Sequence, residues 1–363
     1  MKTKPMTKFA ILTLSLILVA CAGGGSEEAG CPAIDGREIN VVATTPMIGE
    51  FVSQVGGENI NLTVLMPPEA NPHTYEPAPQ DAGTIAEADL VFYTGLLYEP
   101  AALVKLLENS ACSTDILSEV GESVFPIEFK EGGHDDHDDH DDHDDEEGHD
   151  DEEGRDDHDD EEGHDDEEGH DDHDDEEGHD DHEGHNHGAY DPHFWFDPSR
   201  VAYAAEYIES RLIQFDPENE SSYKSSADSF VSELNDLTKQ VSELISTVPS
   251  QNRKLITTHE SLGYLEAKFG LEVLSTIIPS LNSANEISPS DLAGVIDVIE
   301  DNNVKVIFIE SEAPSVYSET IVAETGIKSV TGLYVETLKP GQSYSEFLIS
   351  NVKLITENLQ DTD

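Results

Sequence analysis

The chain has 363 residues, with 18 Lys and Arg against 79 Asp and Glu and a formal net charge of −61 at pH 7. Nucleic acid and anionic lipid headgroups attract basic surfaces, so this composition excludes them as electrostatic partners and fits the attraction of cations. About half of the charge lies in residues 134–187. Without this tract and the leader, roughly 290 residues remain, enough for two lobes of ordinary size.

The N-terminus has the form of an export signal. Residues 1–20 begin with three lysines and continue as a 12-residue apolar run, which is too short to span a bilayer comfortably. The run ends in LVAC and resembles a lipoprotein signal peptide that is cleaved before Cys21, which then carries the lipid. A buried helix or an uncleaved anchor is the alternative. We expect residues 21–37 to be the lipidated cysteine and a tether, and the mature protein to be extracytoplasmic, either periplasmic or on the cell surface.

Two further cysteines, Cys31 and Cys112, follow the export signal. An exported compartment permits a disulfide between them. Neither cysteine has metal-ligand spacing to another cysteine. A disulfide and two separate buried thiols both remain open at this point.

The first half of the chain alternates strand-like and helix-like segments. The predicted strands are residues 38–44, 61–66 and 89–94, and the predicted helices are residues 81–88 and 101–108. This rhythm is typical of a parallel sheet with helices on its faces. We expect an N-terminal α/β lobe over residues 38–131, completed by residues 190–215.

Residues 132–189 interrupt this lobe with a tract that is expected to be a disordered loop. Residues 134–187 contain 33 acidic residues, thirteen histidines and one basic residue, Arg155, for a formal charge of −32. The tract has almost no apolar side chains to offset chain entropy. Because imidazole and carboxylate bind divalent transition metals, we interpret it as an auxiliary metal-binding segment. Its histidines are His134, His137, His140, His143, His149, His158, His164, His170, His173, His179, His182, His185 and His187.

Two helices are predicted after the tract. Asp197 has the character of an N-cap and Pro198 that of a first helical residue. The apolar positions of this helix are Val201, Ala205, Ile208 and Leu212. The next helix is predicted over residues 216–249, roughly 46 Å long at 1.5 Å per residue. Its apolar positions, in alternating steps of four and three, are Tyr223, Ala227, Phe230, Leu234, Leu237, Val241, Leu244 and Val248.

Such a stripe is also compatible with a dimeric coiled coil. We favour one helix that links two lobes, because the α/β rhythm resumes directly after it. The C-terminal lobe is expected over residues 250–363. Its predicted strands are residues 254–258, 271–276, 304–309 and 328–330, and its predicted helices are residues 262–269, 288–302, 315–325 and 343–359. The fold class is therefore α/β, with two parallel-sheet lobes.

Outside the tract, the chain contains three histidines, His73, His193 and His259, in NPHTYEP, DPHFWFDP and TTHES. His73 and His259 follow predicted strands, and open α/β sheets bind ligands beyond the carboxyl ends of their strands. Three imidazoles and one oxygen complete a tetrahedral zinc shell. Each histidine alone has an ordinary explanation as a capping or hydrogen-bonding residue. Their coincidence in such loops predicts an ordered metal site.

Nearly all of residues 38–360 resembles the substrate-binding lipoproteins of bacterial zinc or manganese ABC importers, the cluster A-I group. The motifs that carry the resemblance are MPPEANPHTYEP, DPHFWFDP, TTHESLGYL, VKVIFIE and LYVETLKPGQSYSEFLISN. The His-rich acidic insertion is similar to that of the zinc-specific members. The resemblance implies two α/β lobes joined by one long rigid helix, a metal site between the lobes, and a membrane permease as partner.

The resemblance also implies a ligand set. His73, His193 and His259 match the three histidines of the zinc-type pattern, whereas manganese-type members have a carboxylate where His259 stands. The fourth ligand of the family is a carboxylate, usually aspartate, in the last strand-to-helix loop. Glu336 stands there and is one methylene longer. Glu310, at the end of VIFIE, is the rival fourth ligand, and its other interpretation is a structural carboxylate.

The expected function is to capture zinc outside the membrane and deliver it to an ABC importer permease. We expect a lipid-anchored monomer that is not an enzyme. The alternatives are a manganese-binding homologue, a zinc buffer or adhesin without a permease, and a zinc hydrolase. Three histidines with an open water position would suit a hydrolase. However, the chain has neither an HExxH helix motif nor a Gly-x-Ser-x-Gly motif.

Overall fold

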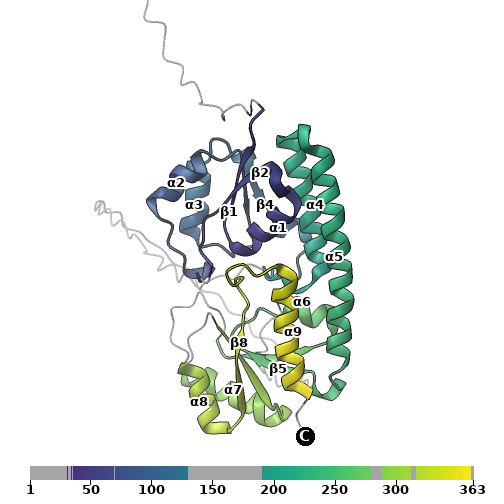
Figure 1. The fold of residues 1–363 in the computed structure, drawn as a ribbon. Coiled ribbons are helices and arrows are strands. Elements are labelled where there is room, and N and C mark those ends of the chain that lie inside the picture. Colours follow the sequence, from purple (N-terminus) through teal and green to yellow (C-terminus); the bar gives the residue numbers. More distant parts are fainter. Residues whose placement is uncertain are drawn as a thin grey trace, which may run out of the picture.

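Two four-stranded parallel sheets form the centres of two lobes, as predicted (Figure 1). The N-terminal sheet has the order β2-β1-β3-β4 and contains β1 (Ile39–Ala43), β2 (Ile60–Val64), β3 (Leu90–Tyr93) and β4 (Leu117–Glu119). The C-terminal sheet has the order β6-β5-β7-β8 and contains β5 (Lys254–Thr257), β6 (Glu272–Thr276), β7 (Val306–Glu310) and β8 (Lys328–Leu333). The computed structural model describes residues 31, 34, 36–68, 70–129, 190–278, 288–311 and 316–360.

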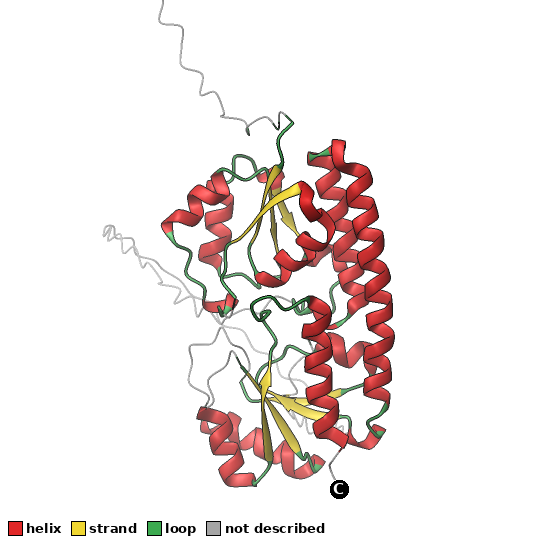
Figure 2. Cartoon of the chain, in the orientation of Figure 1, coloured by secondary structure: helices red, strands yellow, loops and turns green. Residues whose placement is uncertain are grey.

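Helices cover both sheets (Figure 2). The N-terminal lobe contains α1 (Pro46–Gly56), α2 (Pro79–Ala86), α3 (Ala101–Ser110) and α4 (Pro198–Phe215). The long helix α5 (Glu220–Ser246) follows. The C-terminal lobe contains α6 (Gly263–Phe269), α7 (Pro289–Asn302), α8 (Val316–Thr325) and α9 (Tyr344–Gln360). The ends of the predicted elements differ from the observed ends by at most four residues.

Besides short 3₁₀ turns, the structure adds one α-helix and one strand that the sequence did not lead us to predict, α1 and β4. Helix α1 has a recognisable start, because the Thr45 hydroxyl accepts a hydrogen bond from the Ile48 amide and Pro46 is the first residue. Its apolar residues also have helical spacing. Strand β4 has only three residues, which is too short for a period to emerge.

Both sheets run through the same topology, so each has a switch point between its first and third strands. The chain leaves β1 for β2 on one side and returns to β3 on the other, and it does the same around β5. Ligands bind outside the carboxyl ends of strands at such points. In the C-terminal lobe, His259 follows β5 and Glu310 is the last residue of β7.

Helices α4 and α5 follow the predicted patterns closely. The Asp197 carboxylate accepts a hydrogen bond of 2.8 Å from the Ser199 amide, which confirms the predicted N-cap of α4. The predicted stripe of α5 is buried as far as Val241. The next buried residue is Ile245, whereas Leu244 is partly buried, and Val248 just beyond the helix is buried as predicted. A straight helix has 3.6 residues per turn, so a strict seven-residue repeat drifts off the buried face near the end.

Helix α5 lies along both lobes (Figure 1). It contacts α1 and α4 of the N-terminal lobe and α6 and α9 of the C-terminal lobe. Its buried stripe is therefore covered by helices of its own chain and needs no second helix from a coiled-coil partner. The residues of this stripe belong to one hydrophobic core that continues from the first lobe into the second.

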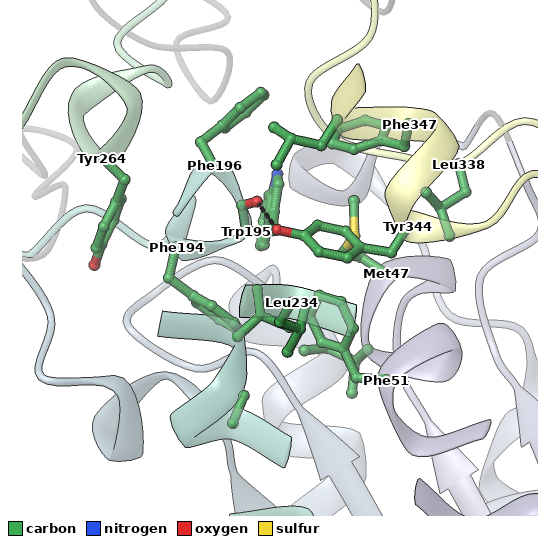
Figure 3. Close-up of a cluster of buried hydrophobic side chains, with 14 of the residues drawn as sticks. Met47, Phe51, Phe194, Trp195, Phe196, Leu234, Tyr264, Leu338, Tyr344 and Phe347 are labelled. Atoms are coloured by element: carbon green, nitrogen blue, oxygen red, sulfur yellow. Dashed lines mark hydrogen bonds between the residues drawn. The ribbon is translucent and has the colours of Figure 1, made fainter. Parts of the chain in front are cut away.

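The motif FWF fills the space between α1 and α9 (Figure 3). Phe194, Trp195 and Phe196 form one 3₁₀ turn and are fully buried. Phe194 lies 6.2 Å from Phe51 of α1, and Phe196 lies 5.8 Å from Phe347 of α9, measured between ring centroids. This aromatic wedge, residues 194–196, thus packs against both lobes directly beside His193.

Three further observations complete the fold. Cys31 and Cys112 are joined by a disulfide with a Cα–Cα distance of 5.0 Å, which is one of the two alternatives left open by the sequence. Among the described helices, none is both long and apolar enough to cross a bilayer. The predicted signal over residues 1–20, the lipidation site Cys21 and the thirteen tract histidines lie outside the described residues.

The burial of Ile245 in place of Leu244 on α5 can be tested by mutation. Ile245→Ala removes a fully buried side chain and should lower the free energy of unfolding by about 2–5 kcal/mol. Leu244→Ala, at the partly buried neighbouring position, should cost about 1 kcal/mol or less. Chemical denaturation of both variants measures the difference. Equal losses would contradict the assignment of Ile245 to the buried face.

Candidate metal centre

Four side chains from separate loops converge between the lobes, namely His73, His193, His259 and Glu336. One ligand atom from each lies within 4.8 Å of all the others. The His73 side chain is 7% exposed and the other three are at most 5% exposed. His73 and His193 belong to the N-terminal lobe, and His259 and Glu336 belong to the C-terminal lobe, so the site closes only when both lobes are in place.

The geometry fits a small divalent cation. Glu336 Oε1 lies 3.2 Å from His73 Nε2, 3.4 Å from His193 Nε2 and 3.0 Å from His259 Nε2. The Nε2 atoms of His193 and His259 are 3.4 Å apart. Bonds of 2.0–2.1 Å at tetrahedral angles place neighbouring ligand atoms about 3.3 Å apart. Four of the six separations are therefore close to the edges of a tetrahedral zinc shell, and all six are within 4.8 Å.

His73 is placed by a 3₁₀ turn, Pro72–Thr74. The Asn71 side chain accepts a hydrogen bond of 2.9 Å from the His73 amide at the start of this turn. The edge of the imidazole packs against Tyr98, with ring centroids 4.9 Å apart. Its Nδ1 has no hydrogen-bond partner among the described residues, so packing and the local turn orient this ring.

His193 is oriented by Asp191. One carboxylate oxygen of Asp191 accepts hydrogen bonds from the His193 amide at 2.8 Å and from Nδ1 at 2.7 Å. This leaves Nε2 free to face the site and makes it a more basic ligand. The backbone of Gly263 approaches the other oxygen so closely that a Cβ atom there would lie 2.6 Å from it. A glycine is therefore needed at the entrance of α6.

His259 is oriented in the same way by Glu310. The Glu310 carboxylate accepts hydrogen bonds from His259 Nδ1 at 2.5 Å and from the His259 amide at 3.2 Å. The Glu310 amide in turn donates to the Thr258 hydroxyl. The structure thus places the rival fourth ligand behind His259, whereas Glu336 lies among the three Nε2 atoms.

Glu336 is fixed from the N-terminal lobe. Its Oε2 accepts a hydrogen bond of 2.8 Å from the Tyr98 hydroxyl. The Trp195 indole donates at 2.9 Å to the carbonyl of Val335, the residue before it. The aromatic wedge therefore positions one ligand from each lobe. His193 directly precedes the wedge in the chain, and Trp195 holds the backbone next to Glu336. Figure 3 also shows the Tyr344 hydroxyl of α9, which donates at 2.6 Å to the Trp195 carbonyl.

The buried charges shift the protonation of the site strongly. Burial by itself lowers the pKa of His193, but the Glu336 charge and the hydrogen bond to Asp191 raise that pKa to about 9. Burial also opposes charge on His259, while Glu310 and Glu336 raise its pKa to about 10. Burial by itself raises the pKa of Glu336, but His73 and His193 hold it well below its usual value. Without a bound metal, His193 and His259 are therefore protonated at neutral pH.

Sequence reasoning did not identify Asp191, Tyr98 or Trp195 as residues of the site. Asp191 carries a usable signal, since an Asx turn two residues before a histidine can hold its ring. Tyr98 and Trp195 carry no local signal, because their roles depend on contacts with the loop after β8, more than 130 residues away.

The fold and the site define a class, a two-lobed α/β protein with a group of potential metal ligands between its lobes. Residues 41–358 match the family described as the periplasmic component A of the zinc-uptake complex, and the chain belongs to this family.

Two relatives of the chain are named for manganese. The chain is 25% identical to the manganese ABC transporter substrate-binding lipoprotein PsaA of Streptococcus anginosus, over 98% of this chain and 99% of the relative. It is 22% identical to the manganese-binding lipoprotein MntA of Halalkalibacterium halodurans, over 95% and 94%.

Solved structures share the fold. The periplasmic zinc binding protein TroA from Treponema pallidum matches with a TM-score of 0.68 and 19% identity, covering 89% of this chain and 99% of that one. The Fe(III)-bound YtgA from Chlamydia trachomatis matches with a TM-score of 0.65 and 22% identity, covering 88% and 98%. The two structures are named for different metals, so similarity to them does not identify the metal that this chain binds.

The raised pKa values predict where protons compete with the metal. A histidine with the ordinary pKa of about 6.5 would lose its metal between roughly pH 6 and 5. Here His193 and His259 stay protonated up to about pH 9 and 10 in the metal-free protein. Metal binding must expel both protons, so apparent zinc affinity should fall about a hundredfold per pH unit between pH 8.5 and 6.5.

Competition with a chromophoric chelator of known proton affinity measures this slope. A flat affinity above pH 7, with loss only between pH 6 and 5, would contradict the raised pKa values.

Proposed function

We propose that this protein captures zinc outside the cytoplasmic membrane and delivers it to the permease of an ABC importer. The observation that carries the proposal is the enclosed set of three imidazole nitrogens and one carboxylate oxygen. Imidazole suits zinc, whereas manganese favours oxygen ligands and higher coordination numbers. The manganese names of the relatives support manganese as the alternative cargo.

The burial of the site favours carriage over catalysis. A catalytic zinc keeps an open position for water and substrate, while a closed shell holds the ion itself as cargo. Here all four ligand side chains are at most 7% exposed, and a carboxylate already occupies the fourth position. This arrangement argues against a zinc hydrolase. It does not separate a carrier from a zinc buffer or an adhesin, which requires a measurement of uptake.

The remaining parts of the proposal concern location and supply. Cys21 carries the lipid that holds the protein at the membrane, and the protein works as a monomer beside the permease. The His-rich acidic tract gathers zinc in weak, exchangeable sites near the ordered one. The tract also leaves and re-enters the fold at one place, since Glu128 pairs with Tyr190 and the Asp191 amide donates to the Ile127 carbonyl at 2.9 Å.

The close approach of these two ends allows the tract to be deleted cleanly. A variant in which a short Gly-Ser linker replaces residues 131–188 should retain one tight zinc per chain and prefer zinc over manganese in competition titrations. His259→Ala should weaken zinc binding more than Glu336→Gln, because the amide of glutamine keeps an oxygen ligand. Loss of all tight binding in the deletion variant, or a preference for manganese, would overturn the zinc assignment.

Delivery is tested in the source cells. Deletion of the gene should reduce uptake of radioactive zinc and slow growth under zinc limitation. Added zinc, but not added manganese, should restore growth. The wild-type gene should restore uptake, and the His259→Ala gene should not. Normal zinc uptake in the deletion strain would support a buffer or an adhesin instead.

A further inference from the structure

The two oxygens of the Glu336 carboxylate have different surroundings. Oε1 faces the three Nε2 atoms at 3.0–3.4 Å. Oε2 accepts a hydrogen bond of 2.8 Å from the Tyr98 hydroxyl, which lies in the opposite lobe. The tyrosine is 1% exposed and packs edge-on against both His73 and Trp195. A buried, charge-assisted hydrogen bond of this length is strong and directional.

Tyr98 is held in place by a strained turn. Gly95, Leu96 and Leu97 have φ angles of 77°, 54° and 60°, so three successive residues are left-handed and two of them are leucines. Such backbone is costly and persists only where the surroundings enforce it. Here the Glu99 carboxylate accepts hydrogen bonds from the Thr94 and Gly95 amides.

A second carboxylate supports the same turn, since Glu119 accepts a hydrogen bond of 2.9 Å from the Leu96 amide. Glu99 also accepts from the Thr44 hydroxyl at the end of β1, and burial raises its pKa. The turn is therefore tied to the switch point of the N-terminal sheet, between β1 and β3. It projects Tyr98 out of this lobe and toward the ligand of the other.

We propose that Tyr98 is a specificity-determining residue that makes Glu336 a one-oxygen ligand. With Oε2 engaged by the hydroxyl, only Oε1 is available to the cargo, and the shell is limited to three nitrogens and one oxygen. This is the four-coordinate arrangement that zinc favours. This inference rests on the proposed function as a metal carrier and adds the reason for its choice of metal.

Loss of the Tyr98 hydroxyl would change how the Glu336 carboxylate binds the metal. Without the hydroxyl, Oε2 loses a donor and can turn to the metal, so that Glu336 binds through both oxygens. The shell then gains a fifth ligand and a second oxygen. Manganese, which favours oxygen and more ligands, gains from this change more than zinc does. Glu336 and Tyr98 thus act as a pair, one supplying the charge and the other restricting how it binds.

Tyr98→Phe removes the hydroxyl and keeps the ring that packs against His73 and Trp195. The variant should lower the ratio of zinc to manganese affinity about tenfold, as expected for the loss of one hydrogen bond to a charged group. Cobalt(II) gives a second readout, because it absorbs visible light much more strongly in a four-coordinate tetrahedral shell than in a five-coordinate one. The wild-type protein should show the strong bands, and the variant should show the weak ones.

Two controls separate this role from a structural one. Tyr223→Phe also removes a buried hydroxyl that donates to a carboxylate, that of Asp216 at 2.6 Å, but it lies on α5 away from the site. It should change neither readout. In a Glu336→Gln background, the amide offers one oxygen only, so adding Tyr98→Phe should leave the cobalt spectrum unchanged.

An unchanged metal ratio and an unchanged cobalt spectrum in Tyr98→Phe would overturn the role of Tyr98 and leave zinc carriage intact. A wild-type protein that prefers manganese, combined with the expected spectral change in Tyr98→Phe, would overturn zinc as the cargo and leave the role of Tyr98 intact. A spectral change of the same size in the Glu336→Gln background would also overturn the proposal, because it would show that Tyr98 acts elsewhere.

Discussion

The buried carboxylate of Glu336 is the constraint on which the rest of the site depends. An ionised carboxylate away from water is costly unless positive charge or hydrogen-bond donors surround it. Here three imidazoles and a tyrosine hydroxyl do so, and His73, His193 and Tyr98 among them come from the N-terminal lobe, opposite Glu336. The charge is thus satisfied only when both lobes are assembled. In the absence of metal, protonated imidazoles supply the positive charge that offsets this carboxylate.

Two features hold this arrangement against motion. The aromatic wedge, residues 194–196, packs on α1 and α9, and α5 contributes one buried stripe to both lobes. Opening the lobes as rigid bodies would expose this shared core to water, at a large cost in apolar surface.

Much of the fold follows from patterns within short stretches of sequence. Strands with a β-branched period and a helix capped by Asp197 are local features, and the structure contains them. The stripe of α5 was predicted correctly except at Leu244, which is only partly buried while Ile245 is buried, because a repeat of four and three only approximates 3.6 residues per turn. Helix α1 had signals that were not used, and β4 had none.

For the candidate site, the sequence pointed to some of the residues that converge in the structure and not to others. Three histidines stood out because the rest of the chain has so few and because two of them follow strands. Glu336 came from resemblance, and its rival Glu310 lies behind His259 in the structure. Tyr98 could not be found in this way. Its position depends on a left-handed turn that contains two leucines, and leucine carries no sequence preference for that conformation.

The disulfide between Cys31 and Cys112 has a mechanical consequence for an anchored protein. If Cys21 carries the lipid as proposed, nine residues lie between Cys21 and Cys31, and this segment reaches about 35 Å when fully extended. Tension on this tether passes through the disulfide into the connection between α3 and β4. Strand β1, which begins at Ile39 and lies in the middle of its sheet, is thereby relieved of load. The crosslink thus protects the sheet that carries the Tyr98 turn from being peeled open by the protein's own tether.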